Sequence, residues 1–323
     1  MIEGDRVRHG CGGNIFKLGC VKKALQPIFV NSEDQQEVQQ VSCHRDPPLD
    51  PNEDKLIQLR LIQMLRNQVI QRSADSPDKY YAKDVERIRT SDWAVMRFIP
   101  DDPLEPIDKI IESIDTCLKW RKEYGIRGIQ LTSFPAEFFA IGLFELGTNA
   151  DTGKSVIYIR GNKYKKISEL TEQFERFGSC LYETLDANVK NGQQRLTAYL
   201  DLKGVSLENV DVPTLRHFLD LMFNFFPNIL QEAFVVDVSW FLRPIVYLLL
   251  KVIPERFTKN VRIVTSKELM QHDVSVVPME LGGSLVTHPL QAGDSTIRLP
   301  DFVHLHNIPQ SVVAKAKKIY KLQ

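Results

Sequence analysis

The sequence predicts an α/β fold in which a mainly parallel sheet is covered by helices, with a small all-helical subdomain in front of it. Four short runs of β-branched and aromatic residues occur after residue 141, and most are apolar on both faces. Helical patterns separate these runs, and helical spacing dominates from residue 53 to residue 127. Strands that are apolar on both faces belong to parallel sheets between helices, and repeated strand–helix–strand units form right-handed crossovers.

Composition and charge limit the possible functions. The 323-residue chain has 41 Lys and Arg residues against 41 Asp and Glu residues, so it lacks the cationic excess of a nucleic-acid-binding protein. Its five cysteines are odd in number and far apart, unlike a secreted disulfide framework. The most apolar stretch, 233–253, is interrupted by charges and a proline and cannot span a membrane. We therefore expect an intracellular, reduced protein without a transmembrane helix.

Changes in composition divide the chain into four segments. The first mixes glycines, a polar stretch and prolines, and we expect it to be disordered. A helical subdomain and the α/β domain follow, and the chain closes with a basic tail that contains an amphipathic helix. These segments are residues 1–52, 53–127, 128–291 and 292–323.

Three helices are predicted in the helical subdomain. Apolar residues recur at helical spacing over 53–72 and over 81–98. The third helix begins at Asp102, a capping residue with Pro103 at the first helical position, and Gly125 ends it.

The α/β domain alternates strands with helices and opens with a hairpin. A turn over 149–153 joins residues 143–146 to the first of the four runs. Although Gly153-Lys154-Ser155 resembles the end of a nucleotide-binding P-loop, position 148 is Thr and a strand follows, so we favour the turn. The predicted strands are 156–159, 196–200, 233–236 and 261–264, and the predicted helices are 169–189, 213–226 and 240–253.

No catalytic or metal-binding group of residues can be assembled from the sequence. There is no Gly-x-Ser-x-Gly elbow, and no cysteine is followed six residues later by the arginine that phosphatase chemistry needs. Cys11, Cys20, Cys43 and His44 lack the paired spacing of a zinc site. An enzyme is therefore not expected, nor is a cofactor or a metal.

The predicted helix 240–253 is apolar around its whole circumference. Such a helix is either buried in the core or faces something apolar that is not protein. The apolar pattern alone favours a buried core helix and an exposed helix about equally. Arg243 and Lys251 are eight positions apart on nearly one face, which fits a helix lying at a membrane surface with two cations toward water or headgroups.

The tail from Phe302 to Gln323 is basic. Its apolar residues fall on one arc of a helix, with the lysines mostly opposite. Packing of this helix on its own domain is the simpler interpretation, and attraction to an anionic membrane is the alternative. The residues that would make the membrane contact are Arg243, Lys251, Lys315, Lys317, Lys318 and Lys321.

Five short motifs in a fixed order resemble those of the CRAL-TRIO family of lipid-binding proteins. They cover about residues 80 to 290, with the expected elements between them. The motifs are Leu118-Lys119-Trp120-Arg121-Lys122-Glu123, Asp151-Thr152-Gly153-Lys154, Tyr199-Leu200-Asp201-Leu202-Lys203-Gly204, Phe225-Phe226-Pro227 before Phe234-Val235-Val236-Asp237, and Val277-Pro278-Met279-Glu280-Leu281-Gly282-Gly283. Within the family, residues 81–87 and 265–267 resemble the corresponding segments of members that continue into a motile-sperm β-sandwich domain and a membrane anchor. This chain is expected to lack both.

The resemblance implies a sheet that floors an apolar cavity, closed by a mobile gate helix that admits one lipid from a membrane. The segment 240–253 matches the gate. A closed apolar cavity offsets the cost of exposing acyl chains to water, about 0.8 kcal/mol per CH₂. The cavity and gate residues implied are Phe218, Met222, Phe225, Phe226, Trp240, Phe241, Ile245, Val246, Leu248, Leu249 and Val252.

The sequence departs from the family pattern at the headgroup site. Members that bind phosphatidylinositol have Glu after the aromatic-Pro pair and Lys at the start of the strand after the gate. Here these positions are Asn228 and Asn260, with Lys259 adjacent, and the proline before the gate is Ser239. A fixed Glu/Lys pair for the headgroup, and with it phosphatidylinositol as the ligand, is therefore not implied.

We expect a cytoplasmic, peripherally membrane-associated protein that binds one lipid and exchanges it at membranes without covalent chemistry. Its partners are a lipid ligand and a transient membrane surface, and a protein partner is left open. The alternative from another class is a lipid-sensing or scaffolding module without net transfer.

Overall fold

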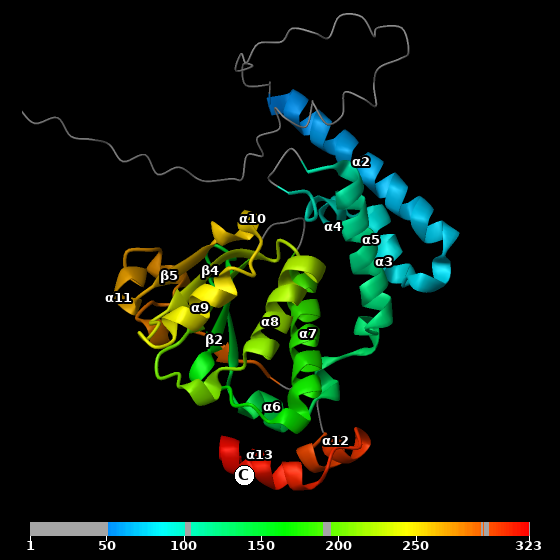
Figure 1. The fold of residues 1–323 in the computed structure, drawn as a ribbon. Helices are drawn as coiled ribbons and strands as arrows, with labels where there is room; N and C mark the ends of the chain where they lie inside the picture. Colours follow the sequence, from blue (N-terminus) through cyan, green and yellow to red (C-terminus); the bar gives the residue numbers. More distant parts are fainter. Residues whose placement is uncertain (1–50, 101–104, 190–194, 292, 294–296, 323) are drawn as a thin grey trace, which may run out of the picture.

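The computed structural model describes residues 51–322, except 101–104, 190–194, 292 and 294–296. Its centre is a six-stranded sheet with helices packed on it, and a group of helices stands beside this unit (Figure 1). The predicted α/β class with a helical region in front of the sheet is confirmed. The disorder expected for the first segment falls outside the described residues, apart from its last two residues, which begin a helix.

The helical subdomain has its own core. Two long helices cross two short ones, and the side chains of Leu65, Val95 and Ile114 are fully buried between them. The helices are α2 (Pro51–Asp75), α3 (Ala82–Thr90), α4 (Asp92–Met96) and α5 (Ile107–Glu123).

The prediction of one helix over 81–98 is wrong, because the chain breaks at Ser91. That residue is extended (φ −118°, ψ 119°), and its Oγ accepts a hydrogen bond from the Ala94 amide at 3.4 Å. Serine competes with helical backbone bonding in this way, so it ends α3 and caps α4.

The third helix begins later than predicted. It starts at Ile107 after Pro106, whose ψ of 135° is extended, and Asp102 and Pro103 lie outside the described residues. Proline disfavours helical backbone at the residue before it, which delays the start. The helix ends as predicted, before Gly125 at φ 71°.

The sheet confirms all four predicted strands and their parallel pairing. Its strand order is β5-β4-β3-β2-β1-β6, with β2 to β5 parallel and β1 antiparallel to both of its neighbours. The two-residue strand β6 is too short to show a pattern in the sequence. The strands are β1 (Phe144–Thr148), β2 (Ser155–Arg160), β3 (Leu196–Asp201), β4 (Leu230–Val236), β5 (Val261–Val264) and β6 (His288–Pro289).

The turn between β1 and β2 is the predicted hairpin turn. The Asn149 side-chain oxygen accepts hydrogen bonds from the amides of Asp151 (3.0 Å) and Thr152 (2.8 Å). Gly153 has a φ of 67°, which glycine adopts without strain. These contacts make it an Asx-type turn and not a P-loop.

Two different sets of elements cover the two faces of the sheet. On one face, Ile157 and Ala198 pack against Leu181 and Leu185 of α7. The opposite face packs against segment 265–285. The helices of this domain are α6 (Ala136–Ala140), α7 (Thr171–Asn188), α8 (Val212–Asp220, continued by a π-helical turn over Leu221–Phe225), α9 (Arg243–Leu250), α10 (Glu255–Thr258) and α11 (Ser266–Leu269).

The basic tail packs on its own domain. It forms α12 (Leu299–Leu305) and α13 (Ser311–Tyr320), which lie below α6 and α7 in Figure 1. Val312 and Ala316 of α13 are buried in the same core cluster as Phe177. The apolar face of the tail therefore serves the fold, as in the simpler of the two interpretations.

Candidate lipid-binding site

The sheet offers an apolar floor on the face that α7 covers. Ile159, Leu200, Val235 and Ile263 pair in register across four strands. A second row on the same face runs from Ile157 through two small residues, Ala198 and Ala233, to Val261. Ala198, in the middle of this row, is buried in the same core cluster as Leu181 and Leu185 of α7.

Helix α9 follows β4 and is shorter than the predicted helix 240–253. Pro244 occupies its first turn and Pro254 caps α10, so turns replace the helix at both ends. Proline suits the first helical turn and is poorly tolerated further in. The covering segment is therefore a short helix between two turns.

One side of the α9 region is buried and the other is exposed. Leu242 and Val246 are buried, whereas Trp240, Tyr247 and Leu248 are 82%, 57% and 56% exposed. Large apolar side chains at such exposure in a contiguous stretch mark an interaction surface. The half-buried side chains between the two sides are Phe241, Ile245, Leu249 and Val252.

The four predicted cavity residues near the end of α8 pack against different partners. Phe218 packs so tightly on α7 that a Cβ added at Gly178 would lie 2.2 Å from its ring. Phe226 is fully buried and stacks on Tyr182. Met222 contributes to both the core under α7 and the cluster beneath α10.

Phe225 instead faces the helical subdomain. Its ring stacks on Trp120 of α5 at a centroid distance of 4.1 Å. Its backbone oxygen accepts a hydrogen bond from the Cys117 thiol at 3.3 Å. The end of α8 therefore joins the sheet domain to α5.

The predicted headgroup residues lie at the amino ends of two neighbouring strands. Asn228 precedes β4, and Asn260 precedes the parallel strand β5. Asn228 adopts φ 58°, and its side-chain amide donates to the Arg97 carbonyl at 2.7 Å. The backbone oxygen of Asn260 accepts from the Ala233 amide, and the Lys259 side chain is exposed. The Asn228 amide thus bonds to the helical subdomain.

The predicted membrane-contact residues divide into two groups. Arg243 and Lys251 are exposed at the two ends of α9. In α13, Lys315 pairs with Glu169 at 2.8 Å. Lys317 is half-buried, and Lys318 and Lys321 are exposed.

A buried ionic interface joins the helical subdomain to α7, and sequence reasoning missed it. Asp186 of α7 binds both Arg87 (2.6 Å) and Arg97. Burial raises the pKa of Asp186, but the charges of Arg97 and Arg87 outweigh burial and hold that pKa below its usual value.

One turn earlier on α7, Glu183 belongs to a second ionic group. It pairs with Arg121 at 2.7 Å and with Arg127 at 3.3 Å, and both arginines also pair with buried Asp84. Taken with the Asp186 group, the interface contains four guanidinium groups and three carboxylates.

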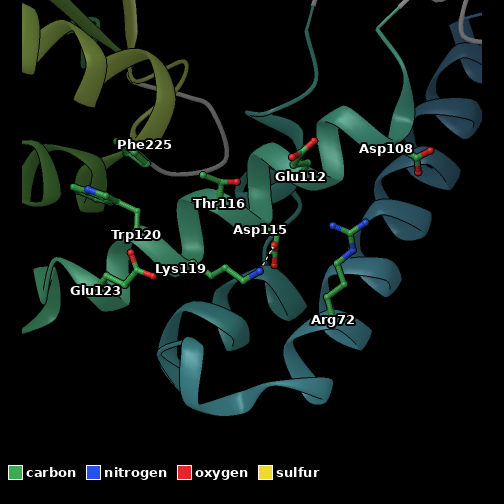
Figure 2. A pocket seen from close by; sticks show the side chains of 9 residues that line it. All are labelled: Arg72, Asp108, Glu112, Asp115, Thr116, Lys119, Trp120, Glu123 and Phe225. Atoms are coloured by element: carbon green, nitrogen blue, oxygen red, sulfur yellow. Dashed lines mark hydrogen bonds and ion pairs between the residues drawn. The ribbon is translucent and has the colours of Figure 1, made fainter.

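A groove of about 670 Å³ lies along α5, but its lining does not suit an acyl chain. Figure 2 shows Arg72 reaching toward it from α2 and Lys119 bonded to Asp115 inside it. Charged walls cannot replace the apolar contacts that a lipid tail needs. The lining residues are Arg72, Asp108, Glu112, Asp115, Thr116, Lys119, Trp120, Glu123 and Phe225. Within the described ranges, no cluster of His, Cys, Asp or Glu could hold a metal.

The fold defines an α/β protein with a helix-covered sheet, an exposed apolar covering helix and an attached helical subdomain. Comparison with known families matches residues 146–283 to the CRAL/TRIO domain. Residues 146–283 therefore form a CRAL/TRIO domain, the domain of the lipid-binding family that the sequence motifs resemble. The comparison does not bear on the narrower resemblance to members with a motile-sperm domain.

A solved structure supports the fold over a wider part of the chain. The crystal structure of Sfh5 is similar with a TM-score of 0.56 at 17% sequence identity. The match covers 84% of this chain and 99% of that one. Separately, none of the helices in the described part of the chain is long and apolar enough to cross a membrane.

Proposed function

We propose that the protein binds a single lipid between the sheet floor and α9 and exchanges it at membranes, with α9 as the gate. The observation that carries this proposal is that one side of the α9 region is buried and the other side is exposed. Its buried side chains face the domain, and its exposed ones are large and apolar. Lipid exchange is then binding and gating, with no covalent chemistry.

The exposed side of α9 suits a membrane interface. Trp240 and Tyr247 have the amphipathic rings that favour the headgroup level of a bilayer. Arg243 and Lys251 at the helix ends would meet anionic headgroups. The protein would thus visit the cytoplasmic face of membranes peripherally, with α9 moving outward to admit the lipid.

We expect Leu248→Asp to slow lipid transfer between liposomes by about tenfold or more. The substitution places a charge where a large apolar side chain would enter the membrane, at a cost of about 2 kcal/mol in lost burial alone. Leu248 is 56% exposed, so the fold should be unchanged. Transfer of fluorescent phospholipid measures the rate, and circular dichroism checks the fold.

Leu305→Asp is the matched control, since Leu305 is 66% exposed in α12, away from α9. Its transfer rate should equal that of the wild type. Equal transfer rates in all three proteins would show that α9 takes no part in lipid exchange. Native mass spectrometry should show one bound lipid per chain. Lipid occupancy without any transfer by the wild type would favour the sensing or scaffolding alternative.

A further inference from the structure

A second groove, of about 430 Å³, lies between the helical subdomain and α7. Its lining includes Arg87 of α3, Ser91 and Trp93 at the start of α4, Arg127, and Glu183 of α7. The groove therefore brings together side chains from four separate segments.

The groove is rich in hydrogen-bond donors. Arg87 and Arg127 line it with side chains that are 30% and 32% exposed, so their guanidinium groups are within reach of solvent and ligand. Arginine has five N–H donors, and Arg87 meets Asp186 through Nη1. The Ser91 oxygen accepts from the Ala94 amide, which leaves its hydroxyl proton free to be donated.

Two buried donors, one in the lining of the groove and one on a residue that packs on the Trp93 ring, have no acceptor among the described residues. They are the indole N–H of Trp93, a residue 7% exposed that lines the groove, and Nη2 of Arg97, a residue 4% exposed. A buried donor without a partner destabilises the fold. Such groups persist where a ligand supplies the acceptor.

The charges behind the groove also favour an anion. Arg87 and Arg97 share the single carboxylate of Asp186, which leaves one positive charge in excess at that point. Arginine pairs well with phosphate because its planar fork matches the oxygen atoms. Oε1 of Glu183 pairs with Arg121 and Arg127, and the buried Oε2 has no donor among the described residues. A ligand that also carries a hydroxyl would satisfy it.

We infer that this groove is a binding site for a phosphate monoester, held by Arg87, Arg127, Ser91 and Trp93. The donors come from α3, from the start of α4 and from Arg127, and guanidinium groups match the oxygen atoms of a phosphate. The volume exceeds that of a phosphate ion alone, so it would hold a phosphorylated small molecule or a lipid headgroup. The site is separate from the floor under α9, and its test does not depend on lipid transfer.

A tryptophan reporter tests the site directly. Trp93, Trp120 and Trp240 are the three tryptophans of the chain, so Trp120→Phe with Trp240→Phe leaves Trp93 as the only indole. Titration with inorganic phosphate or glycerol phosphate should change its fluorescence saturably, unlike chloride at matched ionic strength. Vesicles of phosphatidylcholine with and without phosphatidic acid identify a headgroup as the source when only the acidic vesicles produce the change.

Trp93→Phe keeps an aromatic ring at this position and removes the N–H donor together with part of the indole. By calorimetry, it should weaken phosphate-monoester binding about tenfold, the change expected for one hydrogen bond to a charged group. Because the smaller ring leaves space in the core cluster that contains Trp93, its thermal midpoint without ligand should fall, and circular dichroism should show that the variant stays folded. Trp120→Phe should bind as the wild type does. The inference is overturned if Trp93 fluorescence responds to none of the three probes, or if Trp93→Phe binds with wild-type affinity.

Discussion

Replacing Asp186 by Asn is expected to lower the free energy of unfolding by about 3–5 kcal/mol. Removing one partner of a buried ion pair leaves the other charges buried and uncompensated. Asp186 has a side chain only 1% exposed and is the carboxylate that the Arg87 and Arg97 side chains share. Urea unfolding followed by circular dichroism measures the loss.

Asp92→Asn provides the control for this prediction. Asp92 also pairs with an arginine, Arg66, but its side chain is 56% exposed. Exposed ion pairs contribute about 0–1 kcal/mol, so the control should unfold close to the wild type. If Asp186→Asn were equally mild, the interface between α7 and the helical subdomain would be held by its apolar contacts alone.

Lowering the pH should remove the stabilisation that the ionised Asp186 side chain provides. The pKa of Asp186 in the folded protein lies below its unfolded value of about 3.9. Its stabilisation is therefore complete above the unfolded pKa and is lost as the pH falls through the folded pKa. Between about pH 5 and pH 2, the stability of the wild type should fall more steeply than that of Asp186→Asn. Parallel curves would show that Asp186 does not carry the pH dependence.

Gly283→Ala is the second substitution with a large expected effect. A Cβ at this position would lie 2.0 Å from the Val277 backbone oxygen. A backbone atom cannot move aside without shifting the loop that buries Val277 and Leu281 against the sheet. Overpacking usually costs about 1–3 kcal/mol, and we expect the loss to reach or exceed the upper value.

Gly128→Ala controls for the loss of glycine itself, because a Cβ there would meet nothing within 4 Å. Thermal unfolding should place this control near the wild type, with Gly283→Ala well below both. A Gly283→Ala midpoint equal to that of the control would mean that the loop over 277–283 has room to rearrange.

The strands could be predicted from the sequence because their signal is local. Runs such as 156–159 and 233–236 are apolar on both faces, and this pattern alone indicates a buried parallel sheet. The turn before β2 was equally local, since Asn149 bonds within its own turn. The break at Ser91 escaped prediction because one capping side chain outweighed a continuous helical pattern.

The buried ionic interface could not be predicted because its partners are far apart in sequence. Arg87 and Arg97 are 99 and 89 residues from Asp186. In the sequence they resemble the charged residues of any exposed helix face. The apolar run at the end of α8 left a similar ambiguity, since apolar character does not reveal which neighbour a side chain will face. Phe225 contacts α5, and Phe226 contacts α7.

The π-helical turn at the end of α8 has a consequence for how the molecule can be divided. Its wider spacing allows Met222 to join the cluster beneath α10 while Phe225 stacks on Trp120. A fragment cut to the matched residues 146–283 would keep Met222 but lose Trp120 and the Cys117 thiol. We therefore expect a fragment that includes α5 to be more stable than one cut to residues 146–283.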